Sequence, residues 1–183
     1  HLKTFANRLL QKHDAVIYST GGTYDYLSKH IHFSLSNYGI HSVDRLTFFP
    51  EILSGRVKTL HPSIMGGILA DKKNSHHQRD LKEHHIRNID LVVANLYPFK
   101  KVANDPNKTR ADVIENIDIG GHTMVRAAAK NYENVCVLID PEQYDEYIER
   151  SNKDELTIEY RRELAVKAFQ YISDYDADIN NFF

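Results

Sequence analysis

The sequence predicts an α/β domain in which a mostly parallel sheet is flanked by helices. Short apolar runs that suit buried strands alternate with longer stretches whose apolar residues recur at helical spacing. The run from Ile89 to Asn95 is apolar and continuous, which is typical of a central parallel strand covered on both faces. Ligands of such open sheets bind beyond the carboxyl ends of the strands. The segments 19–23, 56–62, 94–99 and 118–130 are therefore the places to look for a site.

The two periods place the individual elements. Strands are expected at residues 15–18, 66–70, 89–95 and 135–139. Helices are expected at residues 2–13, after residue 23, at 76–85, 109–116 and 122–130, from Pro141, and from Thr157 to the end. The last helix has one apolar face, formed by Leu164, Ala165, Ala168, Phe169 and Ile172. The pattern of residues 31–48 predicts no state.

Length and composition indicate one globular domain over residues 1–183, with 42% hydrophobic and 26% charged residues. No apolar run has the roughly 18 residues of a membrane helix. The single cysteine, Cys136, and an N-terminus without a signal pattern favour a reducing, cytoplasmic setting. The formal charge of −2 argues against a general nucleic-acid binder. Four histidines between residues 76 and 85 have no metal-ligand spacing, so we interpret them as a solvated face and expect no metal.

The first candidate segment, Thr20-Gly21-Gly22-Thr23, joins a strand to a helix. Two glycines let the backbone approach a ligand closely, and the free amides at a helix start favour an anion. This pattern is compatible with a phosphate site and equally with an ordinary tight turn.

The second candidate segment runs from Gly55 to Pro62 and contains Arg56, Lys58 and Thr59. If the segment is extended, Arg56 and Lys58 point to the same side. The residues suit an anion-binding loop, and a solvated basic loop remains the alternative.

The third candidate segment follows the apolar strand, where Asn95 reaches the carboxyl edge and Tyr97 is held extended by the proline after it. The asparagine amide can bind a polar ligand there. A strand exit capped by a packed aromatic residue is the alternative interpretation.

The fourth candidate segment combines Asp118, the Gly120-Gly121 turn and a helix that carries Arg126 and Lys130 four residues apart. A carboxylate near a lysine is a plausible acid–base pair if burial or cationic neighbours lower the pKa of the lysine. A lysine among alanines is also often only a surface residue.

Taken together, these segments closely resemble one family. The matching stretches are STGGT (19–23), FPEILSGRVKTLHP (49–62), GGILA (66–70), IDLVVANLYPF (89–99), ENIDIGGHTMVRAAAKN (115–131) and TIEYRRELAVKAFQYISDYD (157–176). The family is the IMP cyclohydrolase domain of the bifunctional purine biosynthesis proteins, AICAR transformylase/IMP cyclohydrolase. The resemblance implies a methylglyoxal-synthase-like three-layer fold and closure of the purine ring of FAICAR to give IMP and water.

The resemblance also implies roles for individual residues. The substrate-binding residues would be Thr20, Gly21, Gly22, Thr23, Arg56, Lys58, Thr59, Ala94, Asn95, Asp118 and Ile119. The catalytic residues would be Lys130, Lys58, Tyr97 and Asp118. No cofactor would serve this step, because 10-formyltetrahydrofolate belongs to a formyltransferase domain that these residues do not contain. The partners would be the purine ribonucleotide and a second copy of the chain in a homodimer, with neither nucleic acid nor membrane.

The sequence departs from the family pattern at its beginning. The family starts with a strand and a Ser-x-Ser-Asp-Lys-Thr loop, and this chain begins at the helix after them. His122 also stands where proline or a small apolar residue is expected. Three alternatives therefore stay open: a nucleotide- or phosphate-binding regulatory module of the same fold, methylglyoxal synthase, and an inactive fragment.

Overall fold

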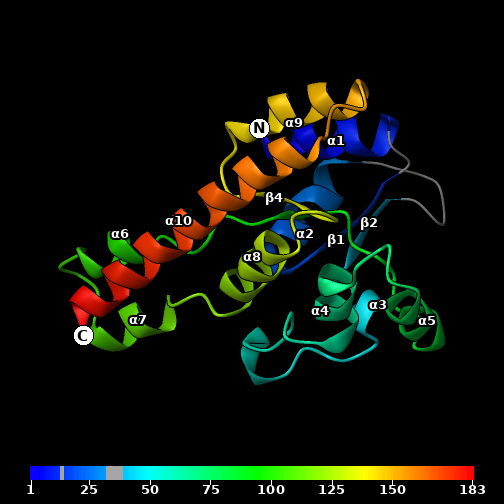
Figure 1. Ribbon diagram of the computed structural model, residues 1–183. Helices are drawn as coiled ribbons and strands as arrows, with labels where there is room; N and C mark the ends of the chain where they lie inside the picture. Colours follow the sequence, from blue (N-terminus) through cyan, green and yellow to red (C-terminus); the bar gives the residue numbers. More distant parts are fainter. Residues whose placement is uncertain (13–14, 32–38) are drawn as a thin grey trace.

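The computed structural model describes residues 1–12, 15–31 and 39–183 (Figure 1). The strands are β1 (Val16–Ser19), β2 (Gly39–Ser42), β3 (Leu91–Val93) and β4 (Cys136–Leu138). The helices of the first half are α1 (Leu2–Lys12), α2 (Gly21–His30), α3 (Asp44–Thr47), the 3₁₀ turn η1 (Leu53–Gly55), α4 (Pro62–Leu69) and α5 (Ser75–Glu83). Those of the second half are α6 (Phe99–Ala103), α7 (Arg110–Glu115), α8 (Gly120–Lys130), α9 (Gln143–Asn152) and α10 (Ile158–Phe182).

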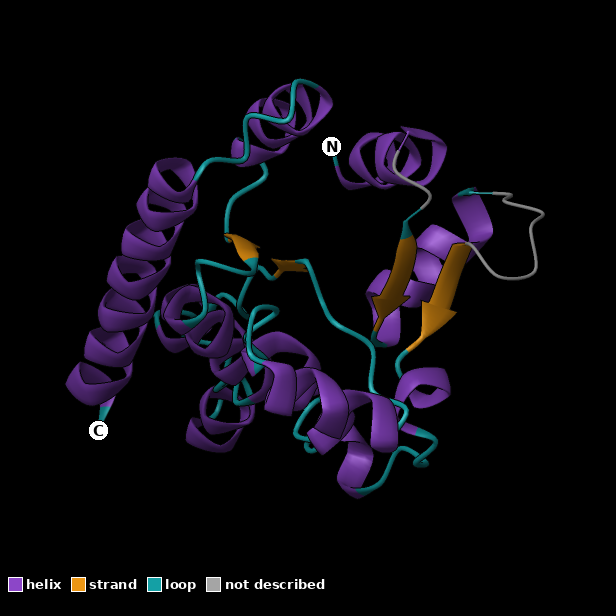
Figure 2. Cartoon of the chain, turned by 45° about the vertical axis from the view of Figure 1, so that its right-hand side comes forward, coloured by secondary structure: helices purple, strands orange, loops and turns teal. Residues whose placement is uncertain are grey.

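The predicted α/β class is confirmed, and every described strand pairing is parallel. Strand β1 pairs with β2, with Val16 opposite Gly39. Strand β3 pairs with β4, with Leu91 opposite Cys136. Within the described ranges the strands thus form two separate pairs instead of one continuous sheet, and Figure 2 shows them apart. Each pair is joined through helices, as parallel strands require.

The predicted strand at residues 66–70 is wrong, because this segment belongs to helix α4. Pro62 occupies the first turn of α4, and the ring nitrogen of His61 accepts a hydrogen bond from the amide of Ser63. A short apolar run cannot be distinguished from a buried helical segment by periodicity alone. The proline and the cap favour a helix start here, and the packing of α4 against α8 stabilises the helix.

The extended conformation predicted for Arg56 and Lys58 is also wrong. Residues 53–55 form the 3₁₀ turn and the chain continues in turns to residue 59. The backbone of Leu53, Ser54 and Gly55 lies at positive φ, which folds the segment back on itself. The two basic side chains consequently leave the loop in different directions.

The other predicted elements are present with small shifts of their ends. His13, the last residue of the first predicted helix, lies outside the described residues. The final helix begins at Ile158, and the Thr157 side chain caps it by accepting the amide of Tyr160. Phe169, predicted on the buried face of that helix, is 40% exposed, whereas its predicted companions are buried.

The core lies between helix α10, helix α8 and the β3–β4 pair. All three residues of β4 are buried, together with Val125, Ala128 and Ile172 from the two helices. Helix α10 runs along α8 and past β4, as the orange-to-red ribbon of Figure 1 shows. Helix α10 also contacts α6. It therefore packs both on the helix that follows β3 and on α8, the helix that leads into β4.

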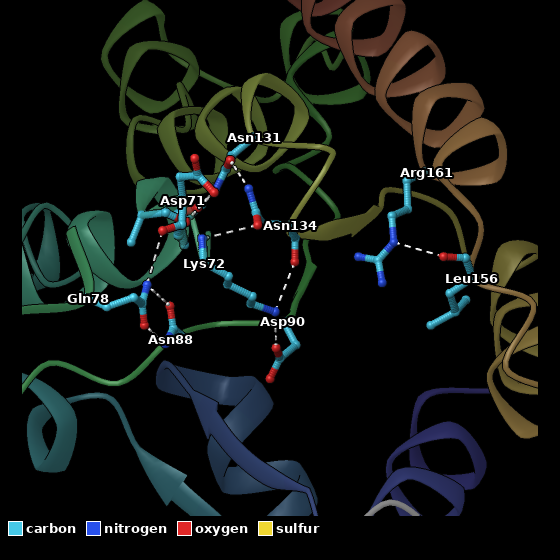
Figure 3. A network of polar contacts seen from close by, with 11 residues as sticks. Asp71, Lys72, Gln78, Asn88, Asp90, Asn131, Asn134, Leu156 and Arg161 are labelled. Atoms are coloured by element: carbon cyan, nitrogen blue, oxygen red, sulfur yellow. Dashed lines mark hydrogen bonds and ion pairs between the residues drawn. The ribbon is translucent and has the colours of Figure 1, made fainter. Parts of the chain in front are cut away.

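A polar network fixes the amino ends of β3 and β4 (Figure 3). The ammonium of Lys72 contacts the carboxylate of Asp90, just before β3, and the carbonyl of Asn134, just before β4. The side-chain Nδ2 of Asn131, which follows α8, donates to the carbonyls of Ile68 and Ala70 at 2.7 and 3.0 Å. The carboxyl ends of the same strands lie at the opposite edge. Among the described residues, no helix is long and apolar enough to cross a membrane.

Candidate functional site

The turn between β1 and α2 has the geometry of an anion site. Gly21 begins α2 with φ +47°, a conformation that glycine adopts without strain. Thr20 occupies the N-cap position, but its side chain makes no capping hydrogen bond. The first amides of α2, a helix of 10 residues, therefore lack a side-chain cap at the end of β1, as the start of an anion-binding helix would.

Lys58 lies directly against this turn. A Cβ atom at Gly21 would be 3.3 Å from the Lys58 Nζ, and a Cβ atom at Gly55 would be equally close. The Lys58 side chain is 24% exposed, and its Nζ is 3.8 Å from Glu51 Oε1. The two glycines thus let a half-buried ammonium approach the start of α2. Its positive charge adds to the anion preference of the helix start.

The start of α8 joins the same cluster. Thr59 is 5% exposed, and a side chain at Gly120 would overlap its Oγ1. The Oδ1 atom of Asp118 accepts the amide of Gly121 at 2.7 Å. The structure therefore brings together the Thr20–Thr23 turn, Lys58, Thr59 and the Gly120 turn, which come from three predicted segments. Ile119, next to Asp118, is 55% exposed.

Arg56 points elsewhere. Its guanidinium forms a bidentate ion pair with the carboxylate of Glu115 at the end of α7. Both side chains are more than half exposed. The pair ties the 53–59 loop to the segment that leads into Asp118, and no local pattern predicts it, because the partners are 59 positions apart in the sequence.

The exit of β3 carries Ala94, Asn95 and Tyr97. The amide of Ala94 donates to Leu138 O, and Nδ2 of Asn95 donates to Ile139 O at 2.9 Å. Asn95 therefore uses one of its donors to hold the exit of β4. Tyr97 is 55% exposed at the mouth of an open pocket of about 570 Å³ between α6 and α10. The pocket contains Asn95 and Tyr97, but neither Lys58 nor Asp118 lines it.

Lys130 lies far from the other predicted catalytic residues. It is the last residue of α8, which begins at Gly120, so about 15 Å of helix separates the two positions. Helix α8 leads into β4, so its end lies at the amino edge of the strands, beside Asn131 and its network. Lys130 is exposed there. In this conformation the structure does not bring Lys130 to Asp118.

Two tyrosines of α10 contact the site loops and were not singled out from the sequence. Tyr171 and Tyr175 contact the backbone beside Asn95 and Asp118. Their spacing of four residues was the available signal, since it places them on one helix face. His122 also faces α10, with its Nε2 3.0 Å from Asp176 Oδ1. Within the described ranges, no group of three or more His, Cys, Asp or Glu residues is arranged to hold a metal ion.

Comparison with known proteins identifies the family of the chain. Residues 2–123 match the MGS-like domain family, and residues 128–183 match the AICARFT/IMPCHase bienzyme family. The bifunctional purine biosynthesis protein PurH of Staphylococcus epidermidis is 50% identical over 170 residues, covering 93% of this chain and 33% of the relative. PurH of Macrococcus caseolyticus is 48% identical over 179 residues, covering 98% and 35%.

A solved structure is similar over the whole chain. The crystal structure of ForH superposes with a TM-score of 0.81 at 34% identity and covers 100% of this chain and 90% of that chain. The chain spans about a third of the length of the curated relatives it matches. The chain therefore belongs to the family of the bifunctional purine biosynthesis proteins PurH, and its residues 2–123 correspond to an MGS-like domain.

Proposed function

We propose that this domain is an IMP cyclohydrolase, which closes the purine ring of FAICAR to give IMP and water. The observation that carries the proposal is the cluster at the strand ends, where Lys58, Thr59 and the starts of α2 and α8 meet. The 50% identity to a bifunctional purine biosynthesis protein supports the same activity.

The reaction needs a phosphate anchor, stabilisation of an oxyanion and a proton relay. The carboxamide nitrogen of FAICAR attacks the formyl carbon and the C=O bond becomes a C–O bond. A proton passes from the attacking nitrogen to that oxygen, which gives a tetrahedral carbinolamine with a hydroxyl group. Loss of the hydroxyl group with a proton from nitrogen releases water and leaves the aromatic ring. The anchor is assigned to Thr20, Gly21, Gly22 and Thr23, because free amides at a helix start bind phosphate.

Lys58 is assigned to the developing oxyanion, since its ammonium is half-buried beside the proposed phosphate position. Asp118 and Tyr97 are assigned to the proton relay, with Ala94 and Asn95 at the base and Ile119 at the nucleotide. These groups supply the acid, base and positive charge that the step requires, so the proposed mechanism uses no cofactor. The proposed assembly is a homodimer in the cytoplasm.

A regulatory module that binds a purine nucleotide without turnover is the second candidate. The position of Lys130 favours it, because the predicted acid–base lysine lies at the other end of α8 from Asp118. A binding module needs the phosphate anchor and no proton relay. The two candidates therefore differ in whether FAICAR is converted.

The test is the conversion of FAICAR to IMP by the full chain, together with calorimetric titration of IMP. The enzyme hypothesis expects turnover in the wild type and a loss of about 10²–10³ in kcat for Lys58→Ala. The matched control is Lys153→Ala, an exposed lysine after α9, which should retain both turnover and IMP affinity. IMP binding without turnover in the wild type would contradict the enzyme hypothesis and favour the regulatory module.

Lys130→Ala tests the catalytic role predicted for Lys130 separately. If Lys130 transfers a proton in the reaction, kcat falls by about 10²–10⁴ and IMP affinity changes by only a few-fold. Wild-type turnover in this variant would remove Lys130 from the mechanism and leave proton transfer to the groups near Asp118.

A further inference from the structure

Helix α10 reaches both loops of the proposed site through two side chains on one face. Tyr171 and Tyr175 are four residues apart, which separates them by about 6 Å along the helix axis. Their hydroxyl groups meet the backbone of two different segments, the exit of β3 and the turn before α8.

Tyr175 holds the turn that presents Asp118. Its hydroxyl oxygen accepts the Asp118 amide at 2.8 Å, and its O–H donates to Asn116 O at 3.2 Å. The side chain is buried, and its ring packs edge-on against Phe99 with the centroids 6.1 Å apart. One phenol thus binds both sides of a three-residue turn. The Asp118 carboxylate, positioned in this way, accepts the amide of Gly121.

Tyr171 holds the exit of β3. Its hydroxyl oxygen accepts the amide of Leu96 at 3.2 Å, and Leu96 lies between Asn95 and Tyr97. The Leu96 side chain is buried, so this backbone position is fixed from both sides. Burial raises the pKa of the Tyr171 and Tyr175 phenols, so both hydroxyls keep their protons at neutral pH.

We propose that Tyr171 and Tyr175 are positioning residues that set the Asn95–Tyr97 loop and the Asp118 turn at a fixed separation for the ring closure. Both loops are attached to one rigid helix, so the distance between them follows from the spacing of the two tyrosines. Neither phenol needs to touch the substrate, because each acts through the backbone of a site loop. The inference rests on the proposed function for its catalytic consequence.

The experiment compares three phenylalanine variants of the full chain. Tyr171→Phe and Tyr175→Phe each remove one hydroxyl that binds a site loop. Tyr160→Phe is the matched control, since Tyr160 is on the same helix and buried, and its hydroxyl oxygen has no hydrogen-bond partner among the described residues. The readouts are kcat and KM for FAICAR, thermal unfolding, and hydrogen exchange of the Leu96 and Asp118 amides.

Positioning predicts a split between kinetic constants. We expect kcat to fall about 10-fold to 100-fold in Tyr175→Phe, with KM changed by less than about threefold, because a misplacement near 1 Å costs that much in rate. The Asp118 amide should exchange at least about tenfold faster in the same variant, since it loses its acceptor. Tyr171→Phe should likewise speed the exchange of the Leu96 amide. Tyr160→Phe should leave the exchange rates of both amides unchanged.

Two results would overturn the inference. Unchanged exchange at Asp118 and Leu96 would show that the hydroxyls do not hold the loops, whatever the activity. Faster exchange with wild-type kcat would show that the loops tolerate movement and that the tyrosines serve only stability. If the wild type itself does not convert FAICAR, the proposed function fails, and the exchange rates alone then decide whether the tyrosines position the loops.

Discussion

Two adjacent glycines of α4 offer an internally controlled test of the packing. Gly66 and Gly67 occupy the middle of the same helix, so replacing either with alanine brings the same gain in helix propensity, about 0.5–1 kcal/mol. Their surroundings differ. A Cβ atom at Gly66 would meet Ile86 Cδ1 at 3.5 Å, an ordinary contact. A Cβ atom at Gly67 would lie 2.5 Å from Arg87 O and 3.1 Å from Ile89 Cγ1.

The close approach at Gly67 is part of the architecture. Gly67 O accepts the Ile89 amide at 3.0 Å, which fixes the segment leading into β3 against α4. A backbone carbonyl cannot rotate away as a side chain can, so a methyl group at Gly67 must displace α4 or this segment. Overpacking of that kind costs about 1–3 kcal/mol.

The two substitutions are expected to change the free energy of unfolding in opposite directions. Gly66→Ala should raise the free energy of unfolding by about 0.5–1 kcal/mol, because its methyl group fits. The free energy of unfolding of Gly67→Ala should be lower than that of Gly66→Ala by the packing cost, about 1–3 kcal/mol, because both variants have the same gain in helix propensity. For a chain of this size each kcal/mol moves Tm by about 2–4 °C.

The assay is urea unfolding followed by far-ultraviolet circular dichroism, with thermal unfolding as a second measure. The denaturant slope should be the same for both variants, so that the midpoints report stability. Equal stabilisation of Gly66→Ala and Gly67→Ala would refute the reasoning, because it would mean that no close contact exists at Gly67. A destabilised Gly66→Ala would refute the placement of α4.

Three further predictions concern charge, reactivity and pH. Arg56→Ala should weaken nucleotide binding, and more at low salt than at high salt, because it leaves the exposed carboxylate of Glu115 without its positive partner. Calorimetry that finds equal affinity at all salt concentrations would show that this ion pair does not act on the nucleotide. Burial raises the pKa of the Cys136 thiol, so a thiol reagent should label it only at the rate of unfolding; fast labelling of the native protein would contradict its place in β4. Burial raises the pKa of Tyr160 to about 12 against about 10 for an unfolded tyrosine, so its contribution to stability is complete below about pH 10 and is lost as the pH rises toward 12. The difference in phenolate absorbance between the wild type and Tyr160→Phe separates this group from the other tyrosines among the 11 of the chain, and titration of Tyr160 at the pH of an unfolded tyrosine while the protein is still folded would contradict its burial.

Much of the fold followed from local patterns. The apolar runs at 15–18, 89–95 and 135–139 became strands, and the last of them, β4, is buried along its whole length, as expected of a central parallel strand. The segment after the first of those strands, the Thr20–Thr23 turn, became part of the candidate site, since loops gather at the carboxyl ends of parallel strands. At this turn the local pattern and the site coincide, because Gly21 takes a positive φ at the start of α2.

Where sequence reasoning failed, contacts between distant residues decided the structure. The run at 66–70 is mostly helical because α4 packs against α8. The absence of a side chain at Gly67 also lets the segment before β3 lie close to α4, where the Ile89 amide donates to Gly67 O. Arg56 turns to Glu115, 59 residues away, so no local pattern could reveal its partner.

The sequence by itself determined most of the alternation of helices and strands, the four candidate segments and the family, because these depend on residue types and their local order. The tertiary structure decided which of those segments meet. It placed Lys58 and Thr59 against the starts of α2 and α8, left Lys130 about 15 Å along α8 at the opposite edge, and brought α10 to the site loops. The physical reason is that a side chain's position depends on the direction of its helix and on what that helix packs against, and packing joins residues far apart in the sequence.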